Sequence, residues 1–437
     1  MAQNTFRNTW NRYRSVSIAY RIGAAFVLGS IVGLTVGGPA TVLEPLGDLF
    51  IRLLEMLVIP IVVFTLLMGI RQLSPATLGR VGGQVVLLYA FTSAVAVVIG
   101  LAVANLVDPG TGLTLTDEPV EAESPPSPTE VFLGIVPENP VDAMANTDLL
   151  ATLFFVIVFG LALVLVAEEI DDGAVERGIE TIFDITEAGS EAMFKVVWGV
   201  MEYGVIGVFA LMAVVFADTG PGAIRAFVTL ILALTLAVAL HIAVIHLGVL
   251  IVALTHQSPI AFLIGIKEAL VTALALASSS ATLPVSMANA EDNLRINEGV
   301  YGFSLPLGAT VNMDGTAMYQ GIAAVFAANL VGASLTLTEQ FVVVVLAVLA
   351  SIGAAGVPSA GLIMLTLVLT QLGLPLAVIG FVAGVDPLLD RMRTMTNISG
   401  DLAVATVVGH WNGAVDFGSG IWDGAVTEAP ASAGVSD

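Results

Sequence analysis

Six stretches of mostly apolar residues, each long enough to cross a lipid bilayer, constrain this chain more than any other feature. They occupy residues 20–40, 50–70, 84–107, 149–167, 199–217 and 226–255. About 20 apolar residues span the hydrocarbon core as a helix, which satisfies its own backbone hydrogen bonds there. The sequence therefore predicts an all-α, multi-pass protein of the cell membrane, in contact with the lipid bilayer.

The formal net charge is −22, although charged side chains make up only 11% of the residues. The acid falls largely in residues 117–130, 168–192 and 416–437, and we interpret 108–128 and 168–192 as surface loops. An acidic exterior with two lysines resembles proteins of halophiles, where salt screens self-repulsion; a set of acidic loops would also explain it. We expect no nucleic-acid partner. The lack of cysteine excludes disulfides and thiolate metal sites.

Arginines indicate the orientation of the chain. Arg7, Arg12, Arg14 and Arg21 precede or begin the first apolar stretch, and no cleavable signal peptide is evident. Cytoplasmic segments of membrane proteins carry an excess of basic residues. We therefore predict a cytoplasmic N-terminus, with residues 1–15 as a basic N-terminal segment.

The last part of the chain has a different pattern. Residues 258–293 and 338–374 each contain two apolar runs too short to span, separated by polar or glycine-rich residues. A longer helix with polar residues follows each of them, at 299–330 and 375–409. Two short core helices joined by a turn would explain one such segment. Two in matching positions favour a transporter site built from inverted repeats.

The helix expected at 375–409 carries the densest set of ionisable residues. Five of them step by four, three, four and four residues and so share one helix face: Asp386, Asp390, Arg393, Asn397 and Asp401. Charges at membrane depth mark a functional site by default. Ion pairs that hold helices together are the alternative, but they would account for only one Asp–Arg pair.

Two further clusters offer oxygen ligands. Asn312, Asp314 and the glycine at 315 suggest local unwinding that frees carbonyl groups, which would suit a small hard cation; a kinked helix with a capping aspartate is the alternative. Hydroxyl groups recur at Tyr89, Thr92 and Ser93. His241 and His246 are five residues apart, so on an α-helix they share no face and no metal pair is expected.

Several motifs resemble the glutamate transporter family, the dicarboxylate/amino acid:cation symporters. These are SSSATLP (278–284), NMDGTAMYQG (312–321), SIGAAGVPSAG (351–361) and DRMRTMTNISGD (390–401), with PENPVDAMANTDLLATLFFVIVFGLAL (137–163) and MLVIPIV (56–62) earlier in the chain. The similarity runs from about residue 16 to 410.

The resemblance implies a homotrimer with eight transmembrane helices, two re-entrant helical hairpins and inverted repeats. It implies a scaffold of residues 16–80 and 108–218. An elevator-type transport domain would comprise residues 81–107 and 219–410, with the hairpins as gates. Residues 411–437 would form an acidic tail, expected to be disordered.

The resemblance also implies a site for L-aspartate or L-glutamate. Arg393 would pair with the side-chain carboxylate of the substrate and Asp390 with its amino group. Further contacts are implied for Ser279, Thr316, Thr394 and Asn397, with Val357 and Gly361 at the gate. Arg391 and Ala277 depart from some prokaryotic members, which carry the arginine at the hairpin tip.

Sodium ions are the implied co-transported ions, at three clusters. The first has Asp401 with carbonyl groups of Gly308, Asn312 and Asn397. The second has Thr310 and Met313 with carbonyl groups of Ser351, Ile352 and Ala354. The third has Tyr89, Thr92, Ser93, Asn312 and Asp314.

The expected function is therefore sodium-coupled symport of acidic amino acids and not an enzymatic one. An intramembrane protease would leave Arg393 and Asn397 unexplained, and a simple ion channel would not need the amino-acid site. The alternative within the family is a carrier of neutral amino acids or of C4-dicarboxylates. Arg393 argues against the neutral substrate, and Asp390 against one without an amino group.

Overall fold

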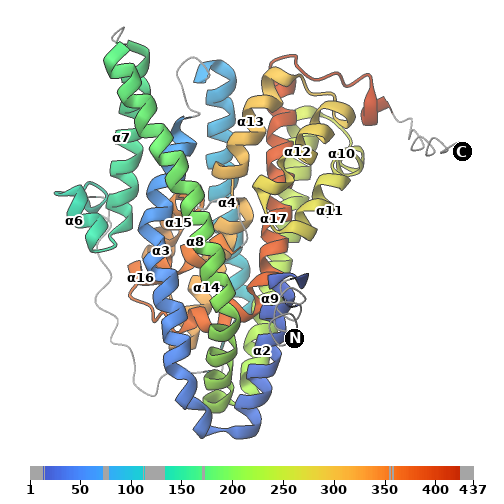
Figure 1. Ribbon diagram of the computed structural model, residues 1–437. Coiled ribbons are helices and arrows are strands. Elements are labelled where there is room, and N and C mark those ends of the chain that lie inside the picture. Colours follow the sequence, from blue (N-terminus) through green and yellow to red (C-terminus); the bar gives the residue numbers. More distant parts are fainter. Residues whose placement is uncertain are drawn as a thin grey trace, which may run out of the picture.

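The computed structural model of the protein describes residues 13, 15–71, 78–111, 113, 133–169, 173–353, 356 and 359–423. Among them the regular structure is helical, without a strand, and one isolated bridge joins Ile296 and Val415 (Figure 1). This confirms the all-α prediction. Five helical stretches among these residues are long and apolar enough to cross a membrane: Ile18–Val36, Gly38–Arg71, Gly79–Val107, Gly173–Thr219 and Gly222–Ala253.

One layer is built from helices α2 (Ile18–Val36), α3 (Glu44–Arg71) and α8 (Gly173–Thr219), with the 3₁₀ turn η1 (Gly38–Leu43) between the first two. Small residues let them approach closely: a Cβ added to Gly33 would collide with the carbonyl group of Ala213. Near the start of α2, the guanidinium of Arg21 donates to both oxygens of Glu202, at 2.6 and 2.9 Å. Beside this layer lie α6 (Pro140–Ala145) and α7 (Leu149–Glu169).

Helix α8 corrects the prediction of a surface loop over 168–192, because its 47 residues begin at Gly173. Its first part is amphipathic. Ile179, Phe183, Thr186 and Ser190 are buried, whereas the acidic residues Glu176, Glu180, Asp184, Glu187 and Glu191 are exposed. Both sets recur every three or four residues, which is the period of a helix with one packed face.

A second group of helices surrounds the polar residues. It includes α4 (Gly83–Val107), which follows the π-helix η2 (Leu78–Gly82), and α9 (Gly222–His241). Helix α9 continues into a π-helical segment, η3 (Ile242–Ala253). Helix α4 packs on α14 (Asp314–Leu330) so closely that a Cβ on Gly100 would lie 2.6 Å from the carbonyl oxygen of Met318.

Each interrupted segment forms a pair of short helices. The first consists of α11 (Lys267–Leu276) and α12 (Ser279–Ala288), preceded by α10 (Pro259–Gly265) and followed by η4 (Asn289–Asn293); the second consists of α15 (Leu337–Gly353) and α16 (Ala360–Gln371). The two tips touch. Ser278 Oγ donates to the carbonyl oxygen of Gly356 at 2.7 Å, and the amide of Ser280 donates to the same oxygen at 3.2 Å.

The polar helices differ from each other in continuity. The one expected at 299–330 is two helices, α13 (Glu298–Val311) and α14 (Asp314–Leu330), broken at Asn312 and Met313. The break thus precedes Gly315, which lies inside α14 against the backbone of Arg393, where a Cβ would collide. The second, α17 (Val378–Trp411), is continuous and passes through the core (Figure 1).

Part of the stretch expected as a tail packs on the segment that joins η4 to α13. After α17, the indole Nε1 of Trp422, in the 3₁₀ turn η5 (Gly420–Asp423), donates to the carbonyl oxygen of Leu294 at 2.8 Å. The amide of Asn297 donates to the carbonyl oxygen of Ala414, also at 2.8 Å. Residues 424–437, like the acidic segment 117–130, lie outside the described residues.

Candidate functional site

Arg393 is the centre of the candidate site and is fully buried in α17. Its Nη2 lies 2.7 Å from Asp390 Oδ1 and 2.8 Å from Asp386 Oδ1, so one nitrogen serves two carboxylates. Its Cζ lies 4.1 Å from the centre of the Tyr319 ring, a cation–π contact. Within the described part of the chain, Nε and Nη1 have no hydrogen-bond partner. The guanidinium therefore keeps donors available for another carboxylate.

The second hairpin lies directly over this guanidinium. A Cβ on Gly361 would lie 2.9 Å from Arg393 Cζ, so only glycine allows the close approach. The carbonyl oxygen of Gly361 accepts from Gln320 Nε2 at 3.0 Å. Asp390 Oδ2 accepts from the amide of Ser359, at the start of α16, at 2.8 Å. Two residues of this hairpin are predicted to lie at the gate. Gly361 lies against the guanidinium of Arg393, and Val357 lies outside the described residues.

Of the remaining residues of the predicted substrate site, two bond to the backbone near Arg393 and two are buried at helix starts. Thr394 Oγ1 donates to the carbonyl oxygen of Asp390 at 2.9 Å. Asn397 Oδ1 accepts from the amide of Gly315 at 2.8 Å and so ties α17 to the start of α14. Thr316 is buried in the first turn of α14, and Ser279 is buried in the first turn of α12.

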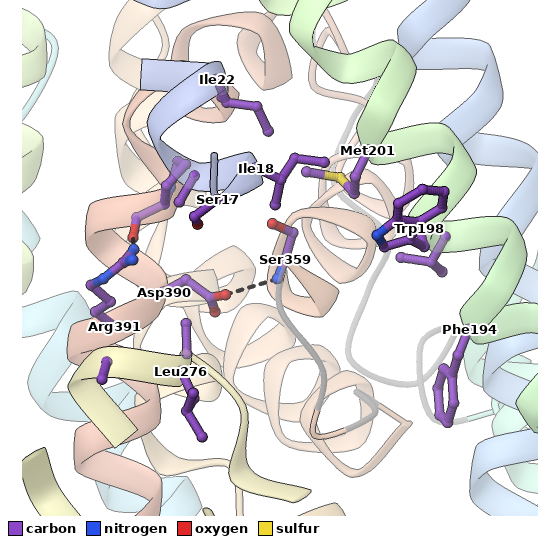
Figure 2. Close-up of a pocket in the computed structure, with 15 residues that line it drawn as sticks. Ser17, Ile18, Ile22, Phe194, Trp198, Met201, Leu276, Ser359, Asp390 and Arg391 are labelled. Atoms are coloured by element: carbon purple, nitrogen blue, oxygen red, sulfur yellow. Dashed lines mark hydrogen bonds between the residues drawn. The ribbon is translucent and has the colours of Figure 1, made fainter. Parts of the chain in front are cut away.

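A cavity of about 270 Å³ opens beside Asp390 (Figure 2). It is lined by the start of α2, by α8, by the end of α11 and by α17, and Figure 2 shows Ser359 and Asp390 facing it together. Ala277 and Arg391 both line it. An arginine at either backbone position would thus reach the same space.

Two of the three predicted sodium clusters are contiguous. Asn312 Nδ2 donates to Asp401 Oδ1 at 2.8 Å, while Asn312 Oδ1 lies 3.2 Å from Thr92 Oγ1. Thr92 and Ser93 donate to Asp314 Oδ1, at 3.1 and 2.8 Å. All five side chains are buried, and their oxygens are hard ligands of the kind that suits small cations.

Tyr89 and Gly308 complete this region. Tyr89 OH donates to the carbonyl oxygen of Ser304 at 2.8 Å. A Cβ on Gly308 would collide with Asp401 Oδ1 and would lie 2.6 Å from Tyr89 OH. Because Gly308 has no side chain, its backbone lies close to Asp401 Oδ1 and to the hydroxyl group of Tyr89, near the break between α13 and α14.

The second cluster is predicted to offer mainly backbone carbonyl groups, and the side-chain contacts of its described members leave that prediction untested. Thr310 Oγ1 donates to the carbonyl oxygen of Leu307 at 3.1 Å, and Ser351 Oγ donates to that of Val348 at 2.7 Å, so each hydroxyl bonds to its own helix. Met313 Sδ lies 3.1 Å from Asn397 Nδ2. Ile352 is helical, and Ala354 lies outside the described residues.

Sequence reasoning missed two residues of the site. His241 and His246 are fully buried, and their Nε2 atoms lie 3.4 and 3.1 Å from Asp314 Oδ2. On an α-helix, residues five apart point away from each other, so the sequence predicts no pair here. The π-helical segment η3 begins between them and brings their ring centres to 4.6 Å. The only available signal was two ionisable residues inside an apolar span.

Comparison with known proteins gives a consistent picture. Residues 18–411 match the model of the Sodium:dicarboxylate symporter family. A proton/sodium-glutamate symport protein of Bacillus subtilis (strain 168) is 34% identical over 410 residues, covering 91% of this chain and 93% of the relative. A proton/glutamate-aspartate symporter of Escherichia coli (strain K12) is 33% identical, covering 90% and 93%. A C4-dicarboxylate transport protein of Azorhizobium caulinodans is 32% identical, covering 90% and 88%.

Proposed function

Because this chain belongs to the Sodium:dicarboxylate symporter family, we propose that it carries an acidic amino acid, aspartate or glutamate, into the cell together with sodium. The protein is a membrane transporter and not an enzyme, and Na⁺ is a co-transported ion. The relatives are named for glutamate, for glutamate and aspartate, and for C4-dicarboxylates, so the substrate has to be argued from the site.

The observation that carries the choice is the pairing of Arg393 with Asp390. An acidic amino acid presents two carboxylates and one ammonium group. Nη1 and Nε of Arg393, which have no hydrogen-bond partner within the described residues, can each donate to the side-chain carboxylate of the substrate. The carboxylate of Asp390, beside the guanidinium, can accept from the ammonium group of the substrate. A C4-dicarboxylate has no ammonium group, so the carboxylates of Asp386 and Asp390 would face an anion without compensation.

We further propose that the chain acts as a homotrimer by an elevator mechanism, with the N-terminus in the cytoplasm. Residues 16–80 and 108–218 would be the scaffold, and residues 81–107 and 219–410 the mobile domain. The contact between Ser278 and Gly356 supports hairpins that close the site as re-entrant gates. The cavity between α2, α8 and the hairpin tips supports a boundary between the two domains at this place.

Uptake of labelled substrates into proteoliposomes tests the proposal. Aspartate and glutamate should accumulate when sodium is present outside only, and replacing sodium by choline should abolish accumulation. Unlabelled succinate, which has the two carboxylates without the ammonium group, should compete poorly. Succinate uptake equal to that of aspartate would favour the C4-dicarboxylate carrier instead.

A further inference from the structure

Three buried ionisable side chains converge in the core at His241, His246 and Asp314. None of the three is exposed. Asp314 Oδ2 lies 3.1 Å from His246 Nε2 and 3.4 Å from His241 Nε2, and one ligand atom from each residue lies within 4.8 Å of the others. No residue of the substrate site is needed to hold this triad, which we call the His–His–Asp triad.

The backbone is specially shaped to assemble the triad. On an α-helix, residues five apart point about 140° away from each other, since successive residues turn by about 100°. Here the chain passes from α9 into the π-helix η3 between the two histidines, and their rings meet edge to face at 79°. π-Helical segments are rare and are frequently found at functional sites.

The donor set and spacing fit a particular class of ion. A tetrahedral zinc ion, with bonds of about 2.0–2.1 Å to nitrogen and oxygen, holds its ligand atoms about 3.3 Å apart. The two distances to Asp314 Oδ2 bracket that value. Two imidazole nitrogens suit Zn²⁺, Co²⁺ or Ni²⁺ and not Na⁺, which takes oxygen. We propose that the His–His–Asp triad is a binding site for a divalent transition-metal ion.

The surroundings support the same assignment. His246 Nδ1 lies 3.1 Å from Ser399 Oγ, so with its proton on Nδ1 the ring leaves Nε2 free to bind an ion. Helix α17 passes close by: a Cβ on Gly400 would lie 2.9 Å from Asp314 Oδ2 and 3.1 Å from His246 Nε2. Glycine at this position leaves room between α17 and the triad.

Occupation of the triad interferes with sodium. Asp314 Oδ1 accepts from Thr92 and Ser93 in the proposed third sodium cluster, whereas Oδ2 faces the histidines. One carboxylate thus lies between the two cation positions. A divalent ion bound at Oδ2 neutralises the negative charge of the Asp314 carboxylate, and its own positive charge repels a sodium ion at Oδ1. The metal ion is therefore an inhibitor of sodium binding.

The test is a titration of the full chain, without a polyhistidine tag, with Co²⁺ in sodium-free choline buffer. Visible d–d absorption reports coordination, and equilibrium dialysis counts the ions. His241→Gln and His246→Gln keep an amide donor for Asp314 but remove the imidazole. The exposed histidines provide matched controls as His256→Asn and His410→Gln. We expect one Co²⁺ per chain, bound roughly tenfold or more weakly in each triad variant and unchanged in the controls.

A second measurement needs no variant. Sodium should raise the Co²⁺ concentration that half-saturates the wild-type protein. Absence of d–d absorption, equal binding by the triad variants, or binding that sodium leaves unchanged would each overturn the metal site. The readout involves no amino acid, so it is separate from the proposed function. A protein that takes up aspartate but binds no Co²⁺ contradicts the metal site alone.

Discussion

Arg393 shows how much one buried side chain can decide. A guanidinium with no exposed surface must be compensated, and two carboxylates of its own helix do this through Nη2 alone. The arrangement leaves Nη1 and Nε without a partner in the described part of the chain. Substrate recognition, as proposed, is then an exchange in which a carboxylate of the ligand joins Arg393 and the ammonium group joins Asp390.

The change Arg393→Cys should remove aspartate binding and leave a neutral pocket that accepts serine. Hydrogen bonds to charged groups are worth about 1.5–3 kcal/mol each, so aspartate affinity should fall by roughly a hundredfold or more. Isothermal titration calorimetry at saturating sodium measures both ligands. Arg391→Cys is the matched control, because this arginine lines the cavity beside Asp390 and makes no ion pair with it within the described residues. Undiminished aspartate affinity in Arg393→Cys would refute the assignment.

Asp401→Asn should weaken sodium binding and, through it, aspartate binding. The asparagine oxygen can still accept from Asn312 Nδ2, so the variant removes charge and preserves the hydrogen bond. Binding linkage is reciprocal: if sodium tightens the substrate, the substrate tightens sodium. The measurement is aspartate affinity as a function of sodium concentration, and the curve should move to higher sodium. If the aspartate affinity of the wild type did not depend on the sodium concentration, coupling between sodium and aspartate binding would be excluded.

The amide side chain at Gln320 leads us to predict that transport carries no proton at this position and needs no internal potassium. The resemblance noted in the motifs implies that animal glutamate transporters carry a glutamate at this position, which is implicated in proton cotransport and potassium countertransport. A side-chain amide cannot titrate. Gln320 Nε2 donates to the carbonyl oxygen of Gly361, beside Arg393. Aspartate uptake should therefore be insensitive to internal potassium, and the lumen should not acidify. Acidification coupled to uptake would point to another carboxylate, such as Asp386, as the proton carrier.

At the scale of elements, much of the site was predictable because polar or glycine-rich residues interrupt the apolar segments around it. Serines at 278–280 and the glycine-rich run at 356–361 end apolar runs that are too short to span, and the two helix pairs lie where these breaks predict. The face formed by Asp386, Asp390 and Arg393 follows from helical spacing alone. The positions of Val357 and Ala354 remain predictions.

Two elements were not predicted from the sequence. For the start of α8 the acidic composition was misleading, and for η3 an α-helix was expected where the chain forms a π-helix. The acidic start of α8 looked like a loop, although its buried positions from Ile179 to Ser190 recur at helical spacing. The segment η3 is apolar apart from His246, so its sequence does not distinguish a π-helix from an α-helix. Its effect on His241 and His246 could not be obtained from a local sequence pattern.

Ser278→Ala should loosen the contact between the hairpin tips. Ser278 Oγ accepts from the amide of Ala281 at 3.1 Å and donates to the carbonyl oxygen of Gly356. Loss of such an N-cap costs about 1 kcal/mol, so amides at this tip should exchange with deuterium roughly fivefold faster. Ser286→Ala is the control, because Ser286 Oγ donates to the carbonyl oxygen of Thr282 within α12 and, among the described residues, makes no hydrogen bond to the other hairpin. Equal exchange in the two variants would contradict a role for the tip contact.

For the molecule as a whole, the surface charge predicts a dependence on salt. A net charge of −22 repels itself, and ions screen that repulsion over a distance of about 8–10 Å at ordinary ionic strength. The midpoint of thermal unfolding should rise steadily as KCl is increased into the molar range, with sodium held constant so that binding does not contribute. A midpoint that is independent of KCl would leave the acidic exterior without a halophilic role.

The break between α13 and α14 has a consequence for how the proposed ion clusters fill. Asn312 turns its amide nitrogen to Asp401 and its amide oxygen to Thr92, so one planar group belongs to two proposed ion clusters. A planar amide cannot rotate for one neighbour without rotating for the other. A change in the orientation of the Asn312 amide therefore alters the ligand geometry of both proposed ion clusters. If both clusters hold sodium as proposed, filling one of them should favour filling the other, so that the ions bind together and not singly.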